Sequence, residues 1–256
     1  MTARPRARVR IGDLWIDALT MPSALDAIEA LVARRHGGSV LTPNVDHVVR
    51  VERDLLLRRA YALADLSLAD GQPIVWASRL LRTPLPEKIS GSDLVGPLLA
   101  RAAARGWRVY LLGGARGSAE AARARLFADP GVSVCGAEGP RVSVEPGADE
   151  AALVDRIRGS NPQLILVGLG CPKQERFIAR NAARLAPAVC LGIGASIDFL
   201  AGAVARAPRW VSRAGLEWLF RLAQEPRRLA RRYLLEDPRF AAIVWHTLRS
   251  DACSLR

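Results

Sequence analysis

The 256-residue sequence predicts an α/β fold: a Rossmann-like parallel sheet sandwiched by helices, followed by a C-terminal basic helical appendage. Short runs rich in Val and Leu alternate with amphipathic helical patterns, which is typical of a parallel sheet covered on both faces. Glycine-rich turns follow several of these runs. After Gly202 the pattern changes, because residues 203–239 hold nine Arg and four acidic residues. We therefore predict a Rossmann-like domain over residues 1–202 and a helical appendage over 203–256.

The first half of the chain supplies two strands and three helices of this pattern. Pro73 suits the first turn of a helix, where its missing N–H costs nothing. The strongest helix is the one in which Leu94, Leu98 and Ala102 share a face and Gly106 ends the pattern. Strands are predicted at 40–42 and 66–68, and helices over 45–62, 73–81 and 93–105.

The second half repeats the alternation more regularly. Strands are predicted at 109–112, 132–135, 164–167 and 189–191, and helices over 118–127, 148–158 and 173–185. Because crossovers between parallel strands are right-handed, a ligand crevice is expected at the carboxyl ends of the strands. The residues that directly follow each strand are therefore the candidates for a functional site.

Composition narrows the possible partners. A net charge of +12 indicates an anionic partner, namely nucleic acid, a phosphorylated substrate or an acidic lipid surface, although an Arg-rich genome is a second source of such an excess. Four Cys without a CxxC pair are typical of reduced thiols in a cytosol. The chain has no apolar run long enough to cross a membrane and no signal peptide. We expect residues 1–10 to form a flexible basic arm.

Two post-strand segments carry polar side chains. Thr42 and Asn44 can hydrogen-bond a sugar or a phosphate, but both types also cap helices, and spacing alone favours the cap. Asp70 precedes Gly71, whose conformational freedom allows a tight turn that projects the carboxylate into the crevice. A carboxylate there can act as a general base, or it can cap the helix that begins near Pro73; both interpretations stay open.

Three further post-strand segments are rich in glycine. Gly113 and Gly114 form a strand-to-helix turn, whose free backbone N–H groups favour an anion, although the segment is neither GxGxxG nor a Walker loop. Gly170 comes just before Lys173, whose charge opposes the helix dipole in a first turn and so favours a functional role. Gly192 and Gly194 allow close approach of a ligand to the backbone.

Asp198 follows this last turn and has two open interpretations. Its carboxylate can bind a ribose or sugar hydroxyl, or it can cap a helix or pair with an Arg of the appendage. Three glycine turns at strand ends together indicate a nucleotide-like ligand. His36, His47 and His246 carry no evident role.

An ordered series of motifs resembles the WecG/TagA/CpsF glycosyltransferases, glycosyltransferase family 26, from about Gly12 to Phe240. The matching segments begin at Thr42, Ala69, Ser90, Leu112, Gly168, Gly192, Arg206, Gly215, Glu225 and Arg232. The resemblance implies inverting transfer of a hexose or N-acetylhexosamine from a UDP-sugar to an undecaprenyl-diphosphate-linked saccharide, in exopolysaccharide or cell-surface polysaccharide synthesis, without a required metal or cofactor. The family often has Phe where this chain has Ile197, so the resemblance does not fix the donor sugar.

Carried over motif by motif, the resemblance makes Asp70 the catalytic base, with Thr42 and Asn44 lining its pocket and Gln174 as a further pocket residue. Arginines of the appendage would meet the diphosphate. The full substrate-binding set is Thr42, Asn44, Gly113, Gly114, Gly170, Lys173, Gln174, Glu175, Gly192, Gly194, Asp198, Arg221, Arg228 and Arg232.

The expected partners are the UDP-sugar, the polyprenyl-diphosphate acceptor and the inner face of the cytoplasmic membrane, with a homo-oligomer possible. A basic, partly apolar helix in the appendage can lie on an anionic leaflet, or its apolar face can pack in the core with the basic face in solvent; both interpretations stay open. Two other classes of protein are alternatives to the glycosyltransferase. A dinucleotide-binding oxidoreductase needs a GxGxxG and a following acid, which the chain lacks. A basic nucleic-acid-binding module, or a nucleotide-binding module without transferase activity, fits the charge, but the chain lacks aromatic platforms and a docking motif, so no nucleic acid is expected.

Overall fold

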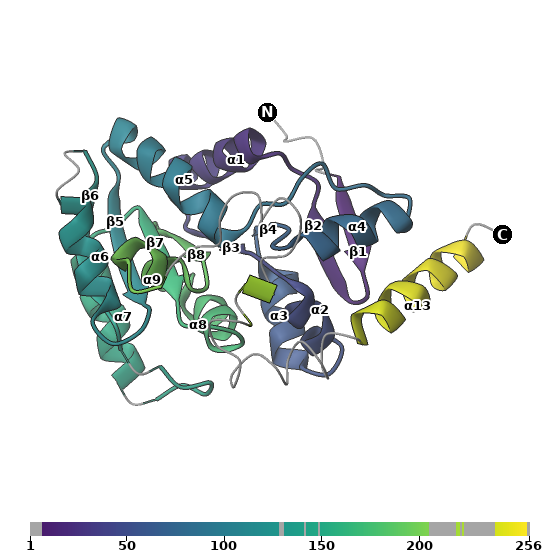
Figure 1. Ribbon diagram of the computed structural model, residues 1–256. Coiled ribbons are helices and arrows are strands. Elements are labelled where there is room, and N and C mark those ends of the chain that lie inside the picture. Colours follow the sequence, from purple (N-terminus) through teal and green to yellow (C-terminus); the bar gives the residue numbers. More distant parts are fainter. Residues whose placement is uncertain are drawn as a thin grey trace.

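A six-stranded, all-parallel sheet forms the centre of the protein, in the order β4-β3-β8-β7-β5-β6 (Figure 1). This computed structural model describes residues 7–127, 131–140, 142–147, 149–204, 219–220, 222 and 239–254. The predicted α/β class is confirmed. The strands are β3 (Gly38–Leu41), β4 (Leu66–Ser67), β5 (Arg108–Gly113), β6 (Ser133–Glu138), β7 (Leu164–Gly168) and β8 (Val189–Gly192).

Helices cover both faces of this sheet, and each face has its own hydrophobic core. Alternate side chains of β7 show the division: Leu164 and Leu166 pack in one cluster, whereas Ile165 and Val167 pack in the other. The described helices are α1 (Met21–Arg34), α2 (Val45–Val51), α3 (Leu55–Leu63), α4 (Gln72–Leu80), α5 (Gly91–Arg105), α6 (Ser118–Phe127), α7 (Asp149–Gly159), α8 (Lys173–Asn181), α9 (Ser196–Ala201) and α13 (Arg239–Ser254).

The predicted single helix over 45–62 is wrong, because the structure has two helices there. Asp54 interrupts it: its carboxylate accepts a hydrogen bond from Leu57 N at 2.9 Å and starts α3 as an N-cap. A second correction concerns β6, which runs to Glu138 and so is longer than the predicted strand at 132–135.

The N-terminal region contains structure that was not expected. β1 (Arg8–Ile11) and β2 (Leu14–Asp17) form an antiparallel hairpin, and α1 follows it. The prediction of a flexible arm over 1–10 is therefore wrong for residues 8–10, because their backbone pairs with β2 and Val9 is buried. Residues 1–6 lie outside the described part of the chain.

The last helix of the chain returns to this hairpin. Gly12 N donates to Thr247 Oγ1 at 2.9 Å, Arg10 Nη2 donates to Ser250 Oγ at 3.2 Å, and Val244 is buried in the core. Thus α13 packs on the β1–β2 hairpin and contributes Val244 to the core. Between residue 204 and α13 only residues 219, 220 and 222 are described, so the predicted diphosphate-binding Arg221, Arg228 and Arg232 lie outside the described residues.

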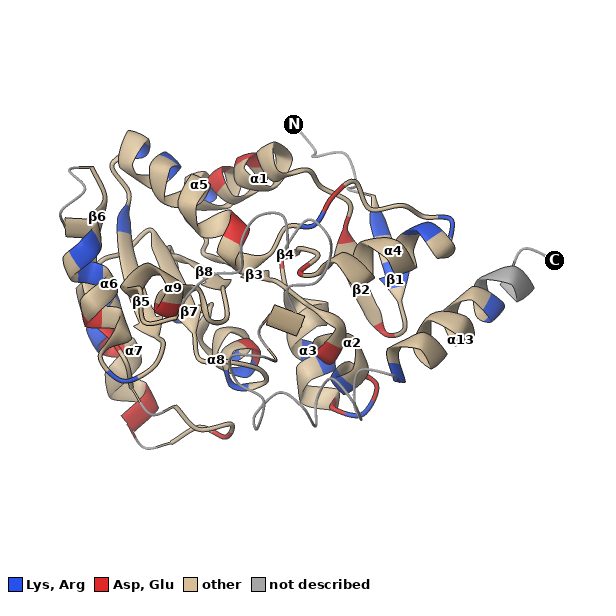
Figure 2. Ribbon diagram, viewed as in Figure 1, with Lys and Arg blue, Asp and Glu red and all other residues tan. Residues whose placement is uncertain are grey.

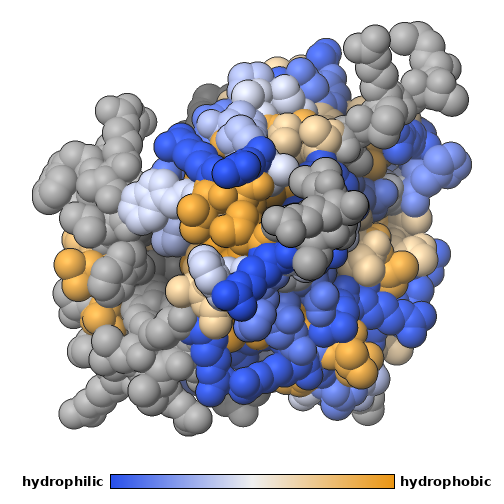
Figure 3. All heavy atoms as spheres, turned by 90° about the vertical axis from the view of Figure 1, so that its right-hand side faces the viewer, coloured by the Kyte–Doolittle hydropathy of each residue, from blue (hydrophilic) through white to orange (hydrophobic). Residues whose placement is uncertain are grey.

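One side of the molecule combines exposed aromatic and basic residues. Trp15 of β2, Trp76 of α4 and Trp245 of α13 are 49%, 49% and 52% exposed. Basic residues lie on β1, at the end of α4 and on α13 (Figure 2), and Arg249 lies 4.8 Å above the Trp245 ring. Figure 3 shows this side with apolar residues gathered in its middle and hydrophilic residues around them. Among the described residues, no helix is long and apolar enough to span a membrane.

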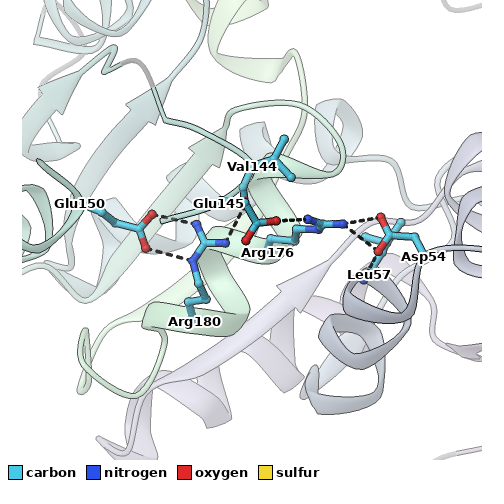
Figure 4. Close-up of polar contacts among 7 residues, drawn as sticks. All are labelled: Asp54, Leu57, Val144, Glu145, Glu150, Arg176 and Arg180. Atoms are coloured by element: carbon cyan, nitrogen blue, oxygen red, sulfur yellow. Dashed lines mark hydrogen bonds and ion pairs between the residues drawn. The ribbon is translucent and has the colours of Figure 1, made fainter. Parts of the chain in front are cut away.

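Arginines of α8 fix that helix to its neighbours (Figure 4). Arg176 binds the Asp54 carboxylate at 2.8 and 2.9 Å and Glu145 at 3.0 Å. One turn later, Arg180 makes a two-pronged contact with Glu150 of α7 at 2.8 and 3.1 Å. The start of α8, which carries Lys173, Gln174 and Glu175, is thereby held in place at the carboxyl edge of the sheet.

Candidate active site

Asp70 lies at the carboxyl edge of the sheet, in the turn between β4 and α4. Its backbone N–H donates to Pro43 O at 2.9 Å, which ties the turn to the segment that leaves β3. The preceding residue accepts a hydrogen bond at Ala69 O from Ile89 N at 2.7 Å, so the approach to α5 lies alongside. Gly71 has φ +121°, a conformation that L side chains rarely adopt. Asp70 is half-buried in this turn.

Thr42 and Asn44 lie on either side of Pro43 and have different contacts. Thr42 is buried, and its hydroxyl donates to Gly192 O at 2.9 Å, which joins the end of β3 to the end of β8. Asn44 is the N-cap of α2: its side-chain oxygen accepts from Asp46 N at 3.1 Å, and its own N–H donates to His47 Nδ1 at 2.9 Å. The cap interpretation is therefore confirmed for Asn44.

Gln174 and Glu175, at the start of α8, are buried rather than open to solvent. Gln174 is 2% exposed; its Oε1 accepts from Gly194 N at 3.0 Å and its Nε2 donates to Glu175 Oε1 at 2.9 Å. Glu175 is 0% exposed. Burial alone would raise the pKa of Glu175, but hydrogen bonds with His47, the backbone and Gln174 outweigh burial and lower it, so the carboxylate is ionised.

The glycine turn after β5 is filled by the protein itself. Asp198 of α9 accepts a hydrogen bond from Ala115 N at 2.7 Å, and a Cβ on Gly114 would lie 3.1 Å from the same carboxylate oxygen. Gly114 N donates to Gly168 O at 2.8 Å. Asp198 therefore caps the turn, in agreement with the second of its two sequence interpretations, and Gly113 and Gly114 bring two strand ends into close contact.

The glycines beside β7 and β8 are more open. A Cβ on Gly170 or Gly194 would have no heavy atom within 4 Å among those compared, and their φ values are +74° and +56°. Gly192 differs, because a Cβ there would lie 2.5 Å from Gln174 Nε2. Lys173 is exposed next to the open corner at Gly170. An anionic group of a ligand could therefore occupy the open space at Gly170 and contact the positive charge of Lys173.

Two features of this edge were missed at the level of sequence. The N-terminus of α5 packs against β8, since a Cβ on Gly91 would lie 2.7 Å from Ile193 O; nearby, Lys88 Nζ pairs with Asp93 at 2.8 Å. The second is His47, whose Nε2 lies 3.4 Å from Glu175 Oε1. His47 stands three residues after the N-cap Asn44, which is the spacing of a capping box. This spacing could have predicted the hydrogen bond between His47 and the backbone N–H of Asn44.

A parallel sheet that gathers a carboxylate, an exposed lysine and open glycine turns at its carboxyl edge is typical of enzymes that bind nucleotide-activated substrates. The chain belongs to the glycosyl transferase WecG/TagA/CpsF family, whose profile matches residues 9–253. A similar curated protein is the N-acetylglucosaminyldiphosphoundecaprenol N-acetyl-beta-D-mannosaminyltransferase of Bacillus spizizenii, which is 31% identical over 217 residues, covering 84% of this chain and 82% of the relative. The family resemblance seen in the motifs is confirmed, and the chain is a glycosyltransferase.

Proposed function

We propose that this chain is an inverting hexosyltransferase that moves a hexose or N-acetylhexosamine from a UDP-sugar to an undecaprenyl-diphosphate-linked saccharide, in the synthesis of exopolysaccharide or another cell-surface polysaccharide. The relative from Bacillus spizizenii supports a polyprenyl-diphosphate-linked N-acetylglucosamine acceptor and an N-acetylmannosamine-type donor. The structural observation that carries the proposal is the turn of Asp70, held by Pro43 O beside Thr42 and the end of β8.

In this mechanism Asp70 is the general base. Its carboxylate takes the proton of the acceptor hydroxyl while the oxygen forms a bond to the anomeric carbon from the face opposite UDP. The bond between that carbon and the UDP oxygen breaks, and its electron pair leaves with UDP. Attack from the opposite face inverts the anomeric configuration. Asp70 thus ends protonated, and returns the proton to solvent.

The leaving diphosphate must be stabilised by positive charge and N–H donors. Lys173 and the open turn at Gly170 lie at the correct edge of the sheet for this role, and we propose that they bind it together with Arg221, Arg228 and Arg232 of the appendage. The sequence has no Asp-x-Asp pair of the kind that metal-dependent glycosyltransferases use. The proposal therefore assigns no step to a metal ion or a cofactor.

We further propose that the enzyme works on the cytoplasmic face of the inner membrane as a peripheral protein. The side that carries Trp15, Trp76 and Trp245 suits an interface, because indole rings favour the boundary between water and lipid. Exposed arginines such as Arg249 add attraction to anionic lipids, at about 1 kcal/mol for each residue near the surface. Sedimentation with phosphatidylglycerol vesicles, but not with phosphatidylcholine vesicles, is the expected result.

A panel of UDP-sugars, assayed with a short-chain prenyl-diphosphate N-acetylglucosamine acceptor and read by mass spectrometry, tests the function. We expect one donor to give a product heavier by one hexose or N-acetylhexosamine, with release of UDP. Failure of every UDP-sugar, combined with a salt-sensitive gel shift of mixed DNA or RNA, would instead support a nucleic-acid-binding protein.

A further inference from the structure

A continuous line of polar contacts, buried at its centre and partly buried at its ends, joins several segments at the carboxyl edge of the sheet. It starts at Gly194 N, which donates to Gln174 Oε1 at 3.0 Å, and continues from Gln174 Nε2 to Glu175 Oε1 at 2.9 Å. His47 Nε2 lies 3.4 Å from the same Glu175 oxygen, and His47 Nδ1 accepts from Asn44 N at 2.9 Å. Both side chains of the central pair are buried, at 8% and 0% exposed. The line therefore connects the loops that follow β8, β7 and β3.

The proton arrangement of His47 follows from these contacts. Because the Asn44 N–H occupies the lone pair of Nδ1, the ring carries its proton on Nε2, which faces Glu175. With its proton on Nε2, the imidazole acts as a bridge between a backbone N–H and a buried carboxylate.

A metal ion is the alternative occupant of this cluster. Ligand atoms of His47, Cys171 and Glu175 lie within 4.8 Å of one another, and the buried Glu175 Oε2 has no hydrogen-bond partner in the part of the chain that the structure describes. Two observations oppose a metal. Binding would need the Nε2 lone pair, which the proton occupies, and a thiolate, whereas burial raises the pKa of Cys171. Hydrogen bonding is the better account of the cluster.

The same line reaches the proposed base. Pro43 directly precedes Asn44, and Pro43 O accepts the Asp70 N–H at 2.9 Å. Tilting the capped end of α2 would therefore shift the Asp70 turn, while loss of the Glu175 contact would free the Gln174 amide. We propose that His47 and Glu175 are positioning residues, which act together to hold the Asp70 turn and Gln174 in mutual register without touching substrate. This inference rests on the proposed function of Asp70.

Two substitutions of His47 distinguish its contact with Asn44 N–H from its contact with Glu175. The amide of His47→Asn lies near the position of Nδ1, so it keeps an acceptor for Asn44 N–H but ends short of Glu175. The amide of His47→Gln lies near the position of Nε2, so it keeps the contact with Glu175 but loses the cap. We expect His47→Asn to keep most of the stability and to lose roughly tenfold in kcat, with the KM for the UDP-sugar within about twofold. His47→Gln should lose stability, yet retain more kcat per folded molecule.

Glu175→Gln tests the other end of the bridge. Combined with His47→Asn, it should cost no more kcat than the larger of the two single changes, because both act through one contact. His246→Asn makes the same chemical change at an exposed histidine of α13 and should match the wild type. If kcat and stability fall in parallel in both His47 variants, or if the double variant is additive, the positioning role is wrong.

Amide hydrogen exchange gives a readout that does not depend on activity. Exchange should become faster at least about tenfold at Gly194 in His47→Asn, which frees Gln174, and at Asp70 in His47→Gln, which loses the cap, and it should stay unchanged in α5 in both variants. Unchanged exchange at both amides overturns the inference even if activity falls. If exchange becomes faster but the wild-type protein transfers no sugar, the proposed function is wrong, whereas the line of contacts through His47 and Glu175 is still supported. One equivalent of zinc that copurifies with the protein, and is lost in Cys171→Ser, overturns the hydrogen-bonded account.

Discussion

Two glycine-containing turns at the carboxyl edge of the sheet, called corners below, differ in what occupies them. After β5, Gly113 and Gly114 turn the chain toward α6, and the carboxylate of Asp198 already accepts the Ala115 N–H. After β7, no heavy atom of the described residues lies within 4 Å of a Cβ position on Gly170, and Lys173 is exposed beside it. The corner after β5 is therefore closed by the carboxylate of Asp198, whereas the corner after β7 is open to an anionic group of a ligand.

This difference shows that a glycine turn before a helix is not sufficient to make an anion-binding site. The turn supplies N–H groups, but the residue opposite decides whether they bind a ligand or the protein itself. Asp70 and Asp198 both follow strand ends in sequence, and Asp198 closes the corner after β5 by accepting the Ala115 N–H. The predictions below compare the two corners, and they compare Asp198 with Asp70, which follows β4.

The largest effect is expected from Asp70→Asn. An amide cannot take the acceptor proton, so turnover should fall by about two orders of magnitude or more, while thermal unfolding stays unchanged. The matched change Asp198→Asn keeps an acceptor for Ala115 N and should keep turnover within about threefold. Initial rates of UDP release measure both. Equal losses in the two variants would show that the Asp198 carboxylate matters for transfer as much as the Asp70 carboxylate.

Gly113→Ala should destabilise the closed corner strongly. Its φ is +109°, and a Cβ would lie 2.5 Å from Gly168 O, a backbone atom that cannot move aside. Together the strain and the overlap should cost about 2.5 kcal/mol. Gly170→Ala has a left-handed φ of +74° but open space, so it should cost only about 1 kcal/mol. Urea unfolding of the pair checks the difference, and equal losses would contradict the two geometries.

Asp198→Ala should remove the anion from the closed corner. Ala115 N–H loses a charged acceptor in an exposed position, which should cost about 1 kcal/mol of unfolding free energy. Because the freed N–H groups resemble those of the open corner, the variant should also gain weak affinity for inorganic phosphate, measured as a rise in melting temperature with phosphate concentration. No such rise would mean that Asp198 is not what closes the corner.

Much of the fold could be predicted, because strands and helices of a parallel sheet leave local patterns. The strands at 109–112 and 164–167 agree with β5 and β7, each of which is one residue longer at one or both ends. The missed hairpin also had a signal: Arg8, Val9, Arg10 and Ile11 alternate exposed and buried, a period-2 pattern that the basic charge of the N-terminus obscured.

The site was less predictable, because its key contacts join distant residues. Ala115 and Asp198 are 83 positions apart, and nothing local distinguishes a carboxylate that caps a turn from one that binds a sugar. The pairing of His47 with Glu175 is likewise a tertiary contact, which is why no role for His47 could be predicted from local patterns. Post-strand position correctly located the edge of the sheet, but only packing assigned each polar group a partner.

The smallest effect is expected at the edge of the sheet beyond the closed corner, where Glu138 is the last residue of β6. Its carboxylate binds Tyr110 Oη and Arg156 Nη2, the latter at 2.9 Å, and the hydrogen bond from Arg156 lowers the pKa of Glu138 despite its partial burial. A lowered pKa means that the folded state favours the ionised form. Its contribution is therefore complete above the ordinary carboxyl pKa and disappears as the pH falls through the lowered value.

Glu138→Gln keeps an acceptor for the Tyr110 hydroxyl but removes the charge. It should cost about 0.5 kcal/mol at pH 7, and the difference from the wild type should vanish in acid. Urea unfolding at a series of pH values measures this. Since no ligand is expected at this end of the sheet, UDP should stabilise wild type and variant equally. If UDP stabilised the variant less, the ligand would extend from the open corner across the closed one, and the division of the edge into two functional halves would be wrong.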